Sequence, residues 1–252
     1  MYQFFVEAGQ IKEGDRSVII TGSDVNHIKN VLRMRVGEEL SVSNGQDGKE
    51  YRCGIAAFEE DRIVCELRFI KEDNVELPAR VYLFQGLPKA DKMELIIQKA
   101  VELGVSGIIP VASRRCVVKL EEKKAAARRQ RWQGIAEAAA KQSRRGIIPE
   151  VCQVTDFREA VRMAAHMDVR LIPYELAEGM DKTRALIDGI RPGQSVAVFI
   201  GPEGGFEQEE ISLAEENGIE AITLGRRILR TETAGLAVLS WIGYALEGTV
   251  TG

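Results

Sequence analysis

The spacing of apolar residues changes near residue 75, and this change constrains the fold more than any other feature of the chain. Up to about Glu72, short runs of alternating apolar and polar residues are separated by turn residues, a pattern typical of β-strands. After Pro78, strand-like runs alternate with helical patterns to the end of the chain. Such alternation is typical of a parallel α/β sheet. The sequence therefore predicts two domains, over residues 1–72 and 73–252.

The first region predicts a small β-barrel. One short helix, from Asp24 to Met34, interrupts the strands behind a Ser23/Asp24 cap. The dipeptides Asn44-Gly45 and Asp47-Gly48 indicate a hairpin, because both accept positive φ. The expected strands cover residues 17–20, 39–43, 51–55 and 62–67.

The second region predicts a mostly parallel sheet with a helix between successive strands. Asp91 and Glu94 stand at capping-box spacing at the start of its first helix, and Gly104 marks the end of that helix. The expected strands cover residues 81–84, 107–111, 150–154, 169–172, 195–200 and 221–224. Further helices are expected in the basic stretch before residue 150, over 157–165, 182–187 and 207–217, and from about Thr233.

Basic residues are concentrated in one segment of an otherwise acidic chain. The net charge is −4, yet Ser113 to Arg145 holds eleven Lys and Arg against three Glu. A positive field on one surface can attract a polyanion such as RNA. A solvated helical face is the alternative interpretation of such a charge run.

Composition excludes several other classes of protein. The chain is 45% apolar, which is too apolar for a disordered protein. Its longest apolar run, Ala234 to Leu246, is shorter than the ~18 residues that a membrane span needs, and the N-terminus does not resemble a signal peptide. Four cysteines without a CxxC pair and only two histidines predict reduced thiols and no metal site. We therefore expect a cytoplasmic protein.

Three loops follow the predicted strands at the edge where parallel α/β sheets bind ligands. They cover residues 173–175, 201–206 and 225–234. Gly201, Gly204 and Gly205 directly follow a buried strand, so the backbone there can approach a ligand closely. No G-x-G-x-x-G motif follows a strand and no glycine loop ends in Gly-Lys-Ser/Thr, which argues against a nucleotide-dependent oxidoreductase or a P-loop enzyme.

Two of these loops carry a resemblance to a known superfamily. Gly201-Pro202-Glu203-Gly204-Gly205 and Leu224-Gly225-x-Arg227-Ile228-Leu229-Arg230-x-Glu232-Thr233-Ala234 resemble the C-terminal motifs of the SPOUT S-adenosylmethionine-dependent RNA methyltransferases. Segments 27–37, 92–105 and 113–119 extend the resemblance almost end to end, to the RsmE family of 16S rRNA (uracil-N3) methyltransferases.

This resemblance implies the fold, the cofactor and the partners. It implies a PUA-like RNA-binding β-barrel followed by a SPOUT α/β domain with a deep trefoil knot, whose knot and cofactor site lie at about residues 172–240. It implies S-adenosyl-L-methionine as cofactor, 16S rRNA or the assembled small ribosomal subunit as substrate, and a homodimer through the knotted domain. The final helix agrees with a dimer, because it is apolar on almost every side and needs covering.

The cofactor would be held by the three loops, through backbone groups and apolar side chains. The expected cofactor-binding residues are Glu175, Ile200, Gly201, Pro202, Glu203, Gly204, Leu224, Gly225, Ile228, Leu229, Thr231, Thr233 and Ala234.

Methylation of uracil N3 requires that the nitrogen lose its proton. Arg230 is the candidate for stabilising negative charge on a uracil carbonyl. Glu232 is the candidate for orienting Arg230 or accepting the proton through water. A structural salt bridge between the two residues is the alternative interpretation.

RNA recognition is expected from the barrel and the basic segment, because arginine suits phosphates and stacked bases. The candidate residues are Lys29, Arg33, Arg35, Arg114, Arg115, Arg144 and Arg145. Two other functions stay open: a SPOUT enzyme that methylates another rRNA or tRNA nucleotide, and a non-catalytic RNA-binding assembly factor.

Overall fold

The computed structural model describes residues 1–72, 75–118, 122–177 and 179–247. It divides into two compact units, one of residues 1–76 and 140–148, the other of residues 77–139 and 149–252.

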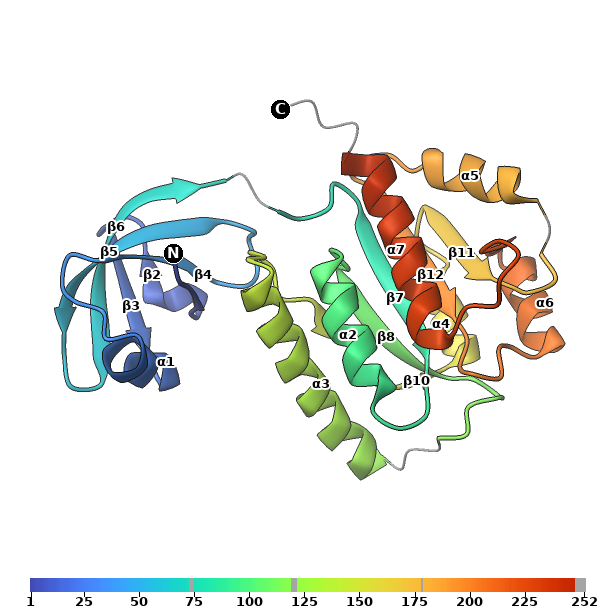
Figure 1. Cartoon of the computed structure of the whole chain (residues 1–252), viewed down its shortest axis with the longest axis horizontal. Helices are drawn as coiled ribbons and strands as arrows, with labels where there is room; N and C mark the ends of the chain where they lie inside the picture. Colours follow the sequence, from blue (N-terminus) through green and yellow to red (C-terminus); the bar gives the residue numbers. More distant parts are fainter. Residues whose placement is uncertain (73–74, 119–121, 178, 248–252) are drawn as a thin grey trace. The chain divides into compact units, whose positions relative to one another are not determined.

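The first unit is a curled six-stranded sheet around its own apolar core (Figure 1). The register between β5 and β6 shifts twice, at Arg52/Cys53 and at Ile55/Ala57, and such bulges increase the twist of a sheet. Neighbouring strands are antiparallel except β1 and β4. In spatial order the strands are β1 (Gln3–Phe5), β4 (Glu39–Ser43), β5 (Glu50–Phe58), β6 (Arg62–Lys71), β3 (Ser17–Thr21) and β2 (Ile11–Lys12).

The expected strands and hairpin of this unit are confirmed. β3, β5 and β6 are longer than predicted, β4 has the predicted bounds, and β1 and β2 were not predicted. The expected short helix is α1 (Ser23–Asn26) followed by one π-helical turn (His27–Val31), with Val25 and Ile28 buried in the core. A 3-10 turn (Ala8–Gln10) completes the unit.

Residues 140–148 belong to the first unit, although the sequence predicted only residues 1–72 there. Arg145 is 2% exposed, and its Nε donates to Glu76 Oε2 at 3.0 Å. Its backbone carbonyl accepts a hydrogen bond from Gln3 Nε2 at 3.0 Å. The Arg145 guanidinium is thus buried in an ion pair, and its expected contact with RNA stays a prediction.

The second unit is a parallel sheet, as the alternating pattern predicted. Its central strands β7 and β12 are hydrogen-bonded to each other along six residue pairs. In spatial order the strands are β10 (Thr155–Asp156), β8 (Gly107–Ala112), β7 (Arg80–Gly86), β12 (Ser195–Ile200), β11 (Val169–Pro173) and β13 (Glu220–Ile222), while β9 (Glu150–Val151) also pairs with β8. The knot that the resemblance implies stays a prediction.

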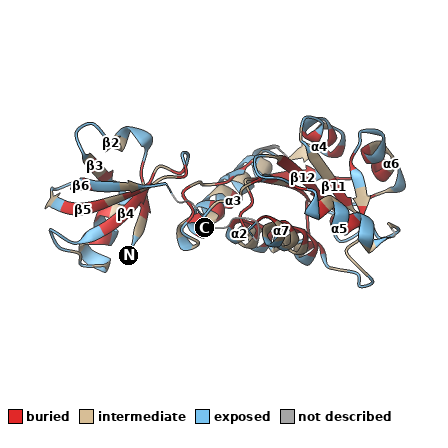
Figure 2. Ribbon diagram, turned by 90° about the horizontal axis from the view of Figure 1, so that it is seen from above, coloured by how far each residue is buried: buried red, intermediate tan, exposed pale blue. Residues whose placement is uncertain are grey.

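Helices cover both faces of this sheet (Figure 2). On one face lie α2 (Lys92–Glu102), α5 (Met180–Asp188) and α7 (Thr231–Glu247). On the other lie α4 (Phe157–Ala164) and α6 (Gln208–Glu216), while α3 (Glu122–Gln142) ends in the first unit. Phe84 and Phe199 stack in the core shared with α4 and α6, with ring centroids 4.4 Å apart.

The start of α2 differs from the capping box that the sequence predicted. The Asp91 side chain accepts no capping hydrogen bond. Asp91 has φ −93° and ψ 11°, outside the extended region that an N-cap residue usually adopts. The Glu94 carboxylate binds the Arg131 guanidinium at 2.8 Å. The predicted end of the helix is confirmed, since Gly104 adopts a φ of +87°.

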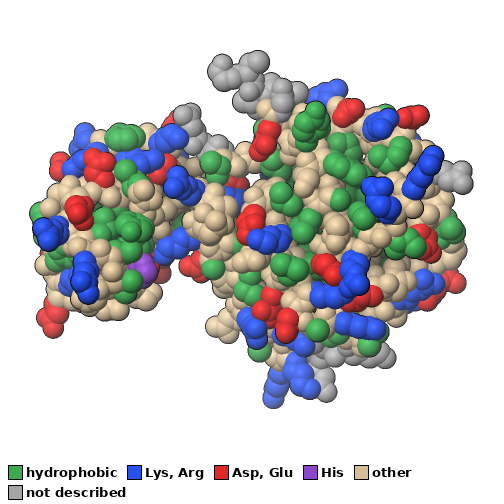
Figure 3. All heavy atoms as spheres, viewed as in Figure 1, with side chains coloured by type: hydrophobic (Ala, Val, Ile, Leu, Met, Phe, Trp, Pro, Cys, Tyr) green, Lys and Arg blue, Asp and Glu red, His purple; other side chains and the backbone are tan. Residues whose placement is uncertain are grey.

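One side of α7 is buried and the other is accessible in this chain. Val238, Leu239 and Ile242 are fully buried, whereas Tyr244 is 86% exposed. Figure 3 shows apolar side chains among the charged ones on the face that carries α2 and α7.

Among the described helices, none combines the length and the apolar character of a membrane span.

Candidate active site

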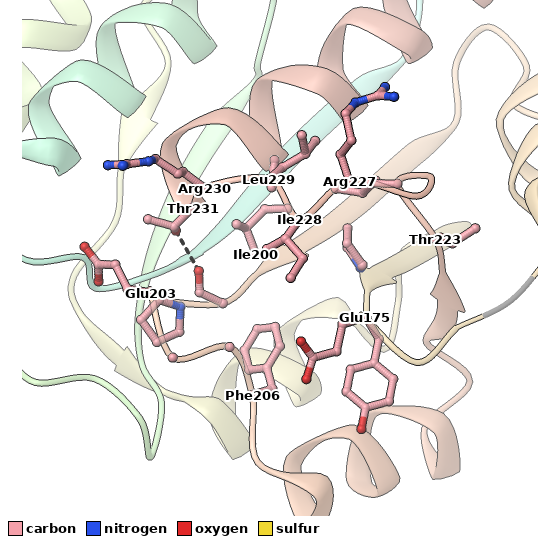
Figure 4. Close-up of a pocket in the computed structure, with 18 of the residues that line it drawn as sticks. Glu175, Ile200, Glu203, Phe206, Thr223, Arg227, Ile228, Leu229, Arg230 and Thr231 are labelled. Carbon is pink, nitrogen blue, oxygen red and sulfur yellow. Dashed lines mark hydrogen bonds between the residues drawn. The ribbon is translucent and has the colours of Figure 1, made fainter.

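A cavity of about 480 Å³ lies at the carboxyl ends of β11, β12 and β13, where the three loops were predicted to meet. This volume is typical of small-molecule sites. Figure 4 shows Glu175 and Phe206 on one side of it and Ile228 across from them. The lining includes every expected cofactor-binding residue except Thr233, together with Lys92, Arg115, Pro173, Tyr174, Gly205, Phe206, Thr223, Arg226, Arg227 and Arg230.

The loop after β12 is held in a tight turn that forms the floor of the cavity. A Cβ on Gly201 would lie 3.0 Å from the backbone of Gly205, so a side chain there would push the turn apart by a few tenths of an ångström. The Gly201 carbonyl accepts a hydrogen bond of 2.6 Å from the Thr231 hydroxyl, which joins this loop to the start of α7 (Figure 4). Thr233 is exposed and does not line the cavity.

Arg115 holds the same loop from the other side. Its Nη1 donates to the Gly204 carbonyl at 2.8 Å, and its Nε and Nη2 contact the Glu207 carboxylate at 2.9 and 3.1 Å. The hydrogen bond to Glu207 raises the pKa of Arg115 and lowers that of Glu207. Arg115 was expected to bind RNA, but in the structure its guanidinium positions the cavity loop.

A lysine that the sequence analysis did not select joins two acidic residues at the cavity. Lys92 Nζ lies 3.0 Å from Glu203 Oε1 and 3.1 Å from Glu232 Oε2. Burial favours a higher pKa for Glu203, but hydrogen bonds from its own backbone N–H, from Lys92 and from the Lys89 N–H lower it overall. The pKa of Glu232 is lowered by its own backbone N–H and by Lys92. Both carboxylates are therefore ionised at neutral pH.

The expected pairing of Arg230 with Glu232 is replaced by the pairing of Lys92 with Glu232. Within the described part of the chain, the Arg230 guanidinium forms no ion pair, and Arg230 is exposed at the cavity. Arg230 acts on Glu232 only through its charge. Lys92 begins α2 just after β7, so its place at the carboxyl edge of the sheet was the signal that could have identified it.

The other candidate RNA-binding residues are distributed over both units. Arg33, Arg35 and Arg144 are exposed in the first unit. Lys29 is half-buried and donates to the backbone carbonyls of Glu59 and Glu60. Arg114 is exposed in the second unit.

Arg114 links the loop after β8 to the first turn of α6 in the second unit. Its backbone N–H donates to Glu210 Oε1 at 2.9 Å, and its guanidinium pairs with Glu209 at 3.3 Å. The backbone of Arg114 is held by Glu210, and its guanidinium is exposed, so a polyanion can reach the guanidinium.

Comparison with known proteins identifies the family of this chain. Residues 75–243 match the RNA methyltransferase domain, and residues 20–68 match the RNA methyltransferase PUA domain. The chain is 39% identical, over 98% of both proteins, to ribosomal RNA small subunit methyltransferase E of Bacillus subtilis. A solved ribosomal RNA small subunit methyltransferase E from Neisseria gonorrhoeae, bound to S-adenosyl methionine, is 33% identical with a TM-score of 0.77 and covers 95% of this chain and 94% of its own. A solved putative methyltransferase from Legionella pneumophila, in complex with the same cofactor, is 34% identical with a TM-score of 0.76 over 91% of this chain and 92% of its own. This chain therefore belongs to the ribosomal RNA small subunit methyltransferase E family.

Proposed function

We propose that this protein transfers a methyl group from S-adenosyl-L-methionine to N3 of a uridine in 16S rRNA of the small ribosomal subunit. The observation that carries the proposal is the cavity of about 480 Å³, because both loops with methyltransferase motifs line it. The small-subunit substrate is supported by the names of the relatives, and the cofactor by two relatives solved with S-adenosylmethionine.

The residues that line the cavity fit this cofactor. Ile200, Leu224, Ile228 and Leu229 provide apolar surface for an adenine ring, and the glycine-rich turn after β12 leaves room for close backbone contact. The carboxylates of Glu175 and Glu203 favour a bound cation. The remaining expected contacts are Gly201, Pro202, Gly204, Gly225, Thr231 and Ala234. Thr233 lies in α7 but does not line the cavity.

The cofactor, when bound, supplies a methyl group on a sulfonium sulfur, which keeps the electron pair of the broken sulfur–carbon bond. On the substrate side, N3 of uracil forms the new bond to the methyl carbon and gives up its proton. Arg230 is free of ion pairs within the described residues and stabilises the negative charge that develops on a uracil carbonyl. The ionised Glu232 carboxylate accepts the N3 proton through water. Orientation of the base against the loops provides the rest of the rate enhancement.

We infer that RNA is bound by cations of both units. Arg33, Arg35 and Arg144 offer exposed guanidinium groups in the first unit, and Lys29 is near Arg33 and Arg35 in sequence. Arg114 offers an exposed guanidinium in the second unit. Arg115 contributes through the cavity loop. Because the proposed substrate is ribosomal RNA, we place the protein in the cytoplasm.

We also propose a homodimer formed through α7. Tyr244 on α7 is 86% exposed and Leu95 on the adjacent α2 is 46% exposed, which leaves apolar surface uncovered in one chain. A second copy of the chain would bury it. Light scattering should give the mass of a dimer, and Tyr244→Glu should shift it towards the monomer; a monomeric wild-type protein would contradict the dimer.

Transfer of labelled methyl groups tests the reaction and the substrate together. The protein is incubated with labelled S-adenosylmethionine and either small subunits or naked 16S rRNA, and the labelled nucleoside is identified. Label in 3-methyluridine is the expected result. Label in another nucleoside, or in tRNA, would favour another SPOUT activity, and RNA binding without any transfer would favour an assembly factor.

A further inference from the structure

We propose that Lys92 is a positioning residue for methyl transfer: it holds the Glu203 and Glu232 carboxylates together beside the cavity and leaves the Arg230 guanidinium free for the substrate. The inference rests on the proposed function and deepens it. In the mechanism above, Lys92 neither stabilises the uracil carbonyl nor accepts the N3 proton. The inference gives it a separate role.

Three segments distant in sequence meet at the Lys92 ammonium. Lys92 is the first residue of α2, Glu203 lies in the loop after β12, and Glu232 is the second residue of α7. The ammonium lies 3.0 Å from one carboxylate and 3.1 Å from the other. The three side chains are 29%, 27% and 17% exposed, so solvent screens them only in part.

The other partners of Glu203 and Glu232 define what Lys92 does for the two carboxylates. Glu203 also accepts hydrogen bonds from the Lys89 backbone N–H at 3.1 and 3.3 Å. Glu232 also feels the charge of Arg230. Among the other charged groups of α2 and the cavity, Glu94 binds Arg131 and Arg115 binds Glu207. Lys92 is therefore the cation shared by both carboxylates.

Removal of this cation has two physical consequences. Two carboxylates held close together without a shared cation do not both ionise readily, so one of them keeps a proton to higher pH. The neighbouring Arg230 then becomes the nearest cation for Glu232, and a guanidinium–carboxylate pair is a strong competitor for substrate contacts. Both consequences slow methyl transfer without emptying the cofactor cavity.

The test compares Lys92→Met and Lys92→Arg with a matched control on the same helix. Lys99→Met also removes a lysine of α2 that is paired with a glutamate, Glu102, at 2.8 Å, but Lys99 does not line the cavity. Methyl transfer to small subunits is measured as kcat, KM for S-adenosylmethionine and the pH profile. We expect Lys92→Met to lower kcat about 100-fold, with KM changed less than about threefold, and to move the acid limb upward by about one pH unit. Lys92→Arg should restore the limb, and Lys99→Met should match the wild type.

A double variant separates positioning from a general loss of stability. If Lys92 acts through Glu232, the kcat of Lys92→Met/Glu232→Gln should equal that of Glu232→Gln alone. Multiplicative losses in the double variant, or wild-type kcat and pH profile in Lys92→Met, would overturn the proposal.

A measurement on the protein without cofactor or RNA keeps the inference independent of activity. Carboxyl ¹³C NMR of glutamate-labelled protein should show one of the two resonances of Glu203 and Glu232 titrating at higher pH in Lys92→Met than in the wild type. Unchanged titration in a folded Lys92→Met protein would contradict the role of Lys92. An inactive wild type with the expected titration shift would contradict only the proposed function.

Discussion

The hydroxyl of Thr231 donates a hydrogen bond of 2.6 Å to the backbone carbonyl of Gly201, which ties the first residue of α7 to the loop after β12 (Figure 4). The same hydroxyl accepts a hydrogen bond of 2.9 Å from the Gln85 amide at the end of β7. Thr231 is 6% exposed, so both bonds are shielded from water. One buried hydroxyl thus connects three segments that build the cavity.

Thr231→Val should weaken the protein and its cofactor site together. Valine keeps the shape of threonine but leaves the Gly201 carbonyl without this donor, at a cost of about 1–3 kcal/mol in the free energy of unfolding. Urea denaturation and calorimetry with S-adenosylmethionine measure the two effects. Thr233→Val is the control, because Thr233 is exposed on the same turn. Equal behaviour of the two variants would contradict the role of the buried hydroxyl.

Arg115→Ala should reduce cofactor affinity by about tenfold, because it removes the bonds that hold Gly204 and Glu207. Arg114→Ala removes an ion pair whose partners are 65% and 69% exposed, which contributes about 0–1 kcal/mol to stability. Calorimetric titration with S-adenosylmethionine distinguishes the two. If Arg115→Ala binds the cofactor like the wild type and loses only RNA affinity, Arg115 is an RNA contact after all.

Arg145→Met should destabilise the protein by about 3 kcal/mol, because it leaves the half-buried Glu76 carboxylate without its guanidinium partner. Arg144→Met should change the free energy of unfolding by less than about 0.5 kcal/mol, since Arg144 is exposed. RNA affinity should respond in the opposite order, with Arg144→Met weakening binding while folded Arg145→Met does not. Denaturation curves and filter binding measure both, and a stable Arg145→Met that binds RNA poorly would reverse the assignment.

Stability should depend on pH through Asp168. The Ser195 backbone N–H and then the Ser195 hydroxyl, each 2.7 Å from Asp168 Oδ2, lower the pKa of this carboxyl in the folded state. A lowered folded-state pKa gives stability above the unfolded value of about 3.9 that is lost as the pH falls through the folded value. Asp168→Asn should therefore unfold more readily than the wild type at about pH 6, with the difference vanishing in acid.

Urea denaturation across this pH range measures the effect of Asp168. Asp181→Asn is the control, because Asp181 is 99% exposed beside Arg184. A constant difference between Asp168→Asn and the wild type at all pH values would show that the bonds to Ser195 do not depend on the carboxylate charge.

The existence and type of the elements followed from local pattern. Alternation between residues 17 and 67 predicted four of the six strands of the first unit and missed β1 and β2. Mostly apolar runs such as 195–200 predicted the central strands of the parallel sheet. Gly104 ended α2 as expected, because its positive φ is a local property of the residue. The capping box at Asp91 was wrong, because the backbone of Asp91 does not adopt the extended conformation of an N-cap residue.

The loops that form the candidate site could be predicted from the sequence, but the ion pairs within the site could not. The rule that ligands bind at the carboxyl edge of a parallel sheet selected residues 173–175, 201–206 and 225–234, and these do line one cavity. The rule could not choose between Arg230 and Lys92 as the partner of Glu232, because the two cations lie 138 positions apart and only packing brings Lys92 into contact.

The sequence by itself determined most of the strands and helices and which loops meet, because periodicity and turn chemistry act over a few residues. It missed the short strands β1, β2 and β10. Only the tertiary structure decided which charges pair. Arg145 became a buried partner of Glu76 and Arg115 a support for Gly204, although neighbouring arginines stayed exposed. The physical reason is that an ion pair depends on distance and burial, and both are set by how remote segments pack together.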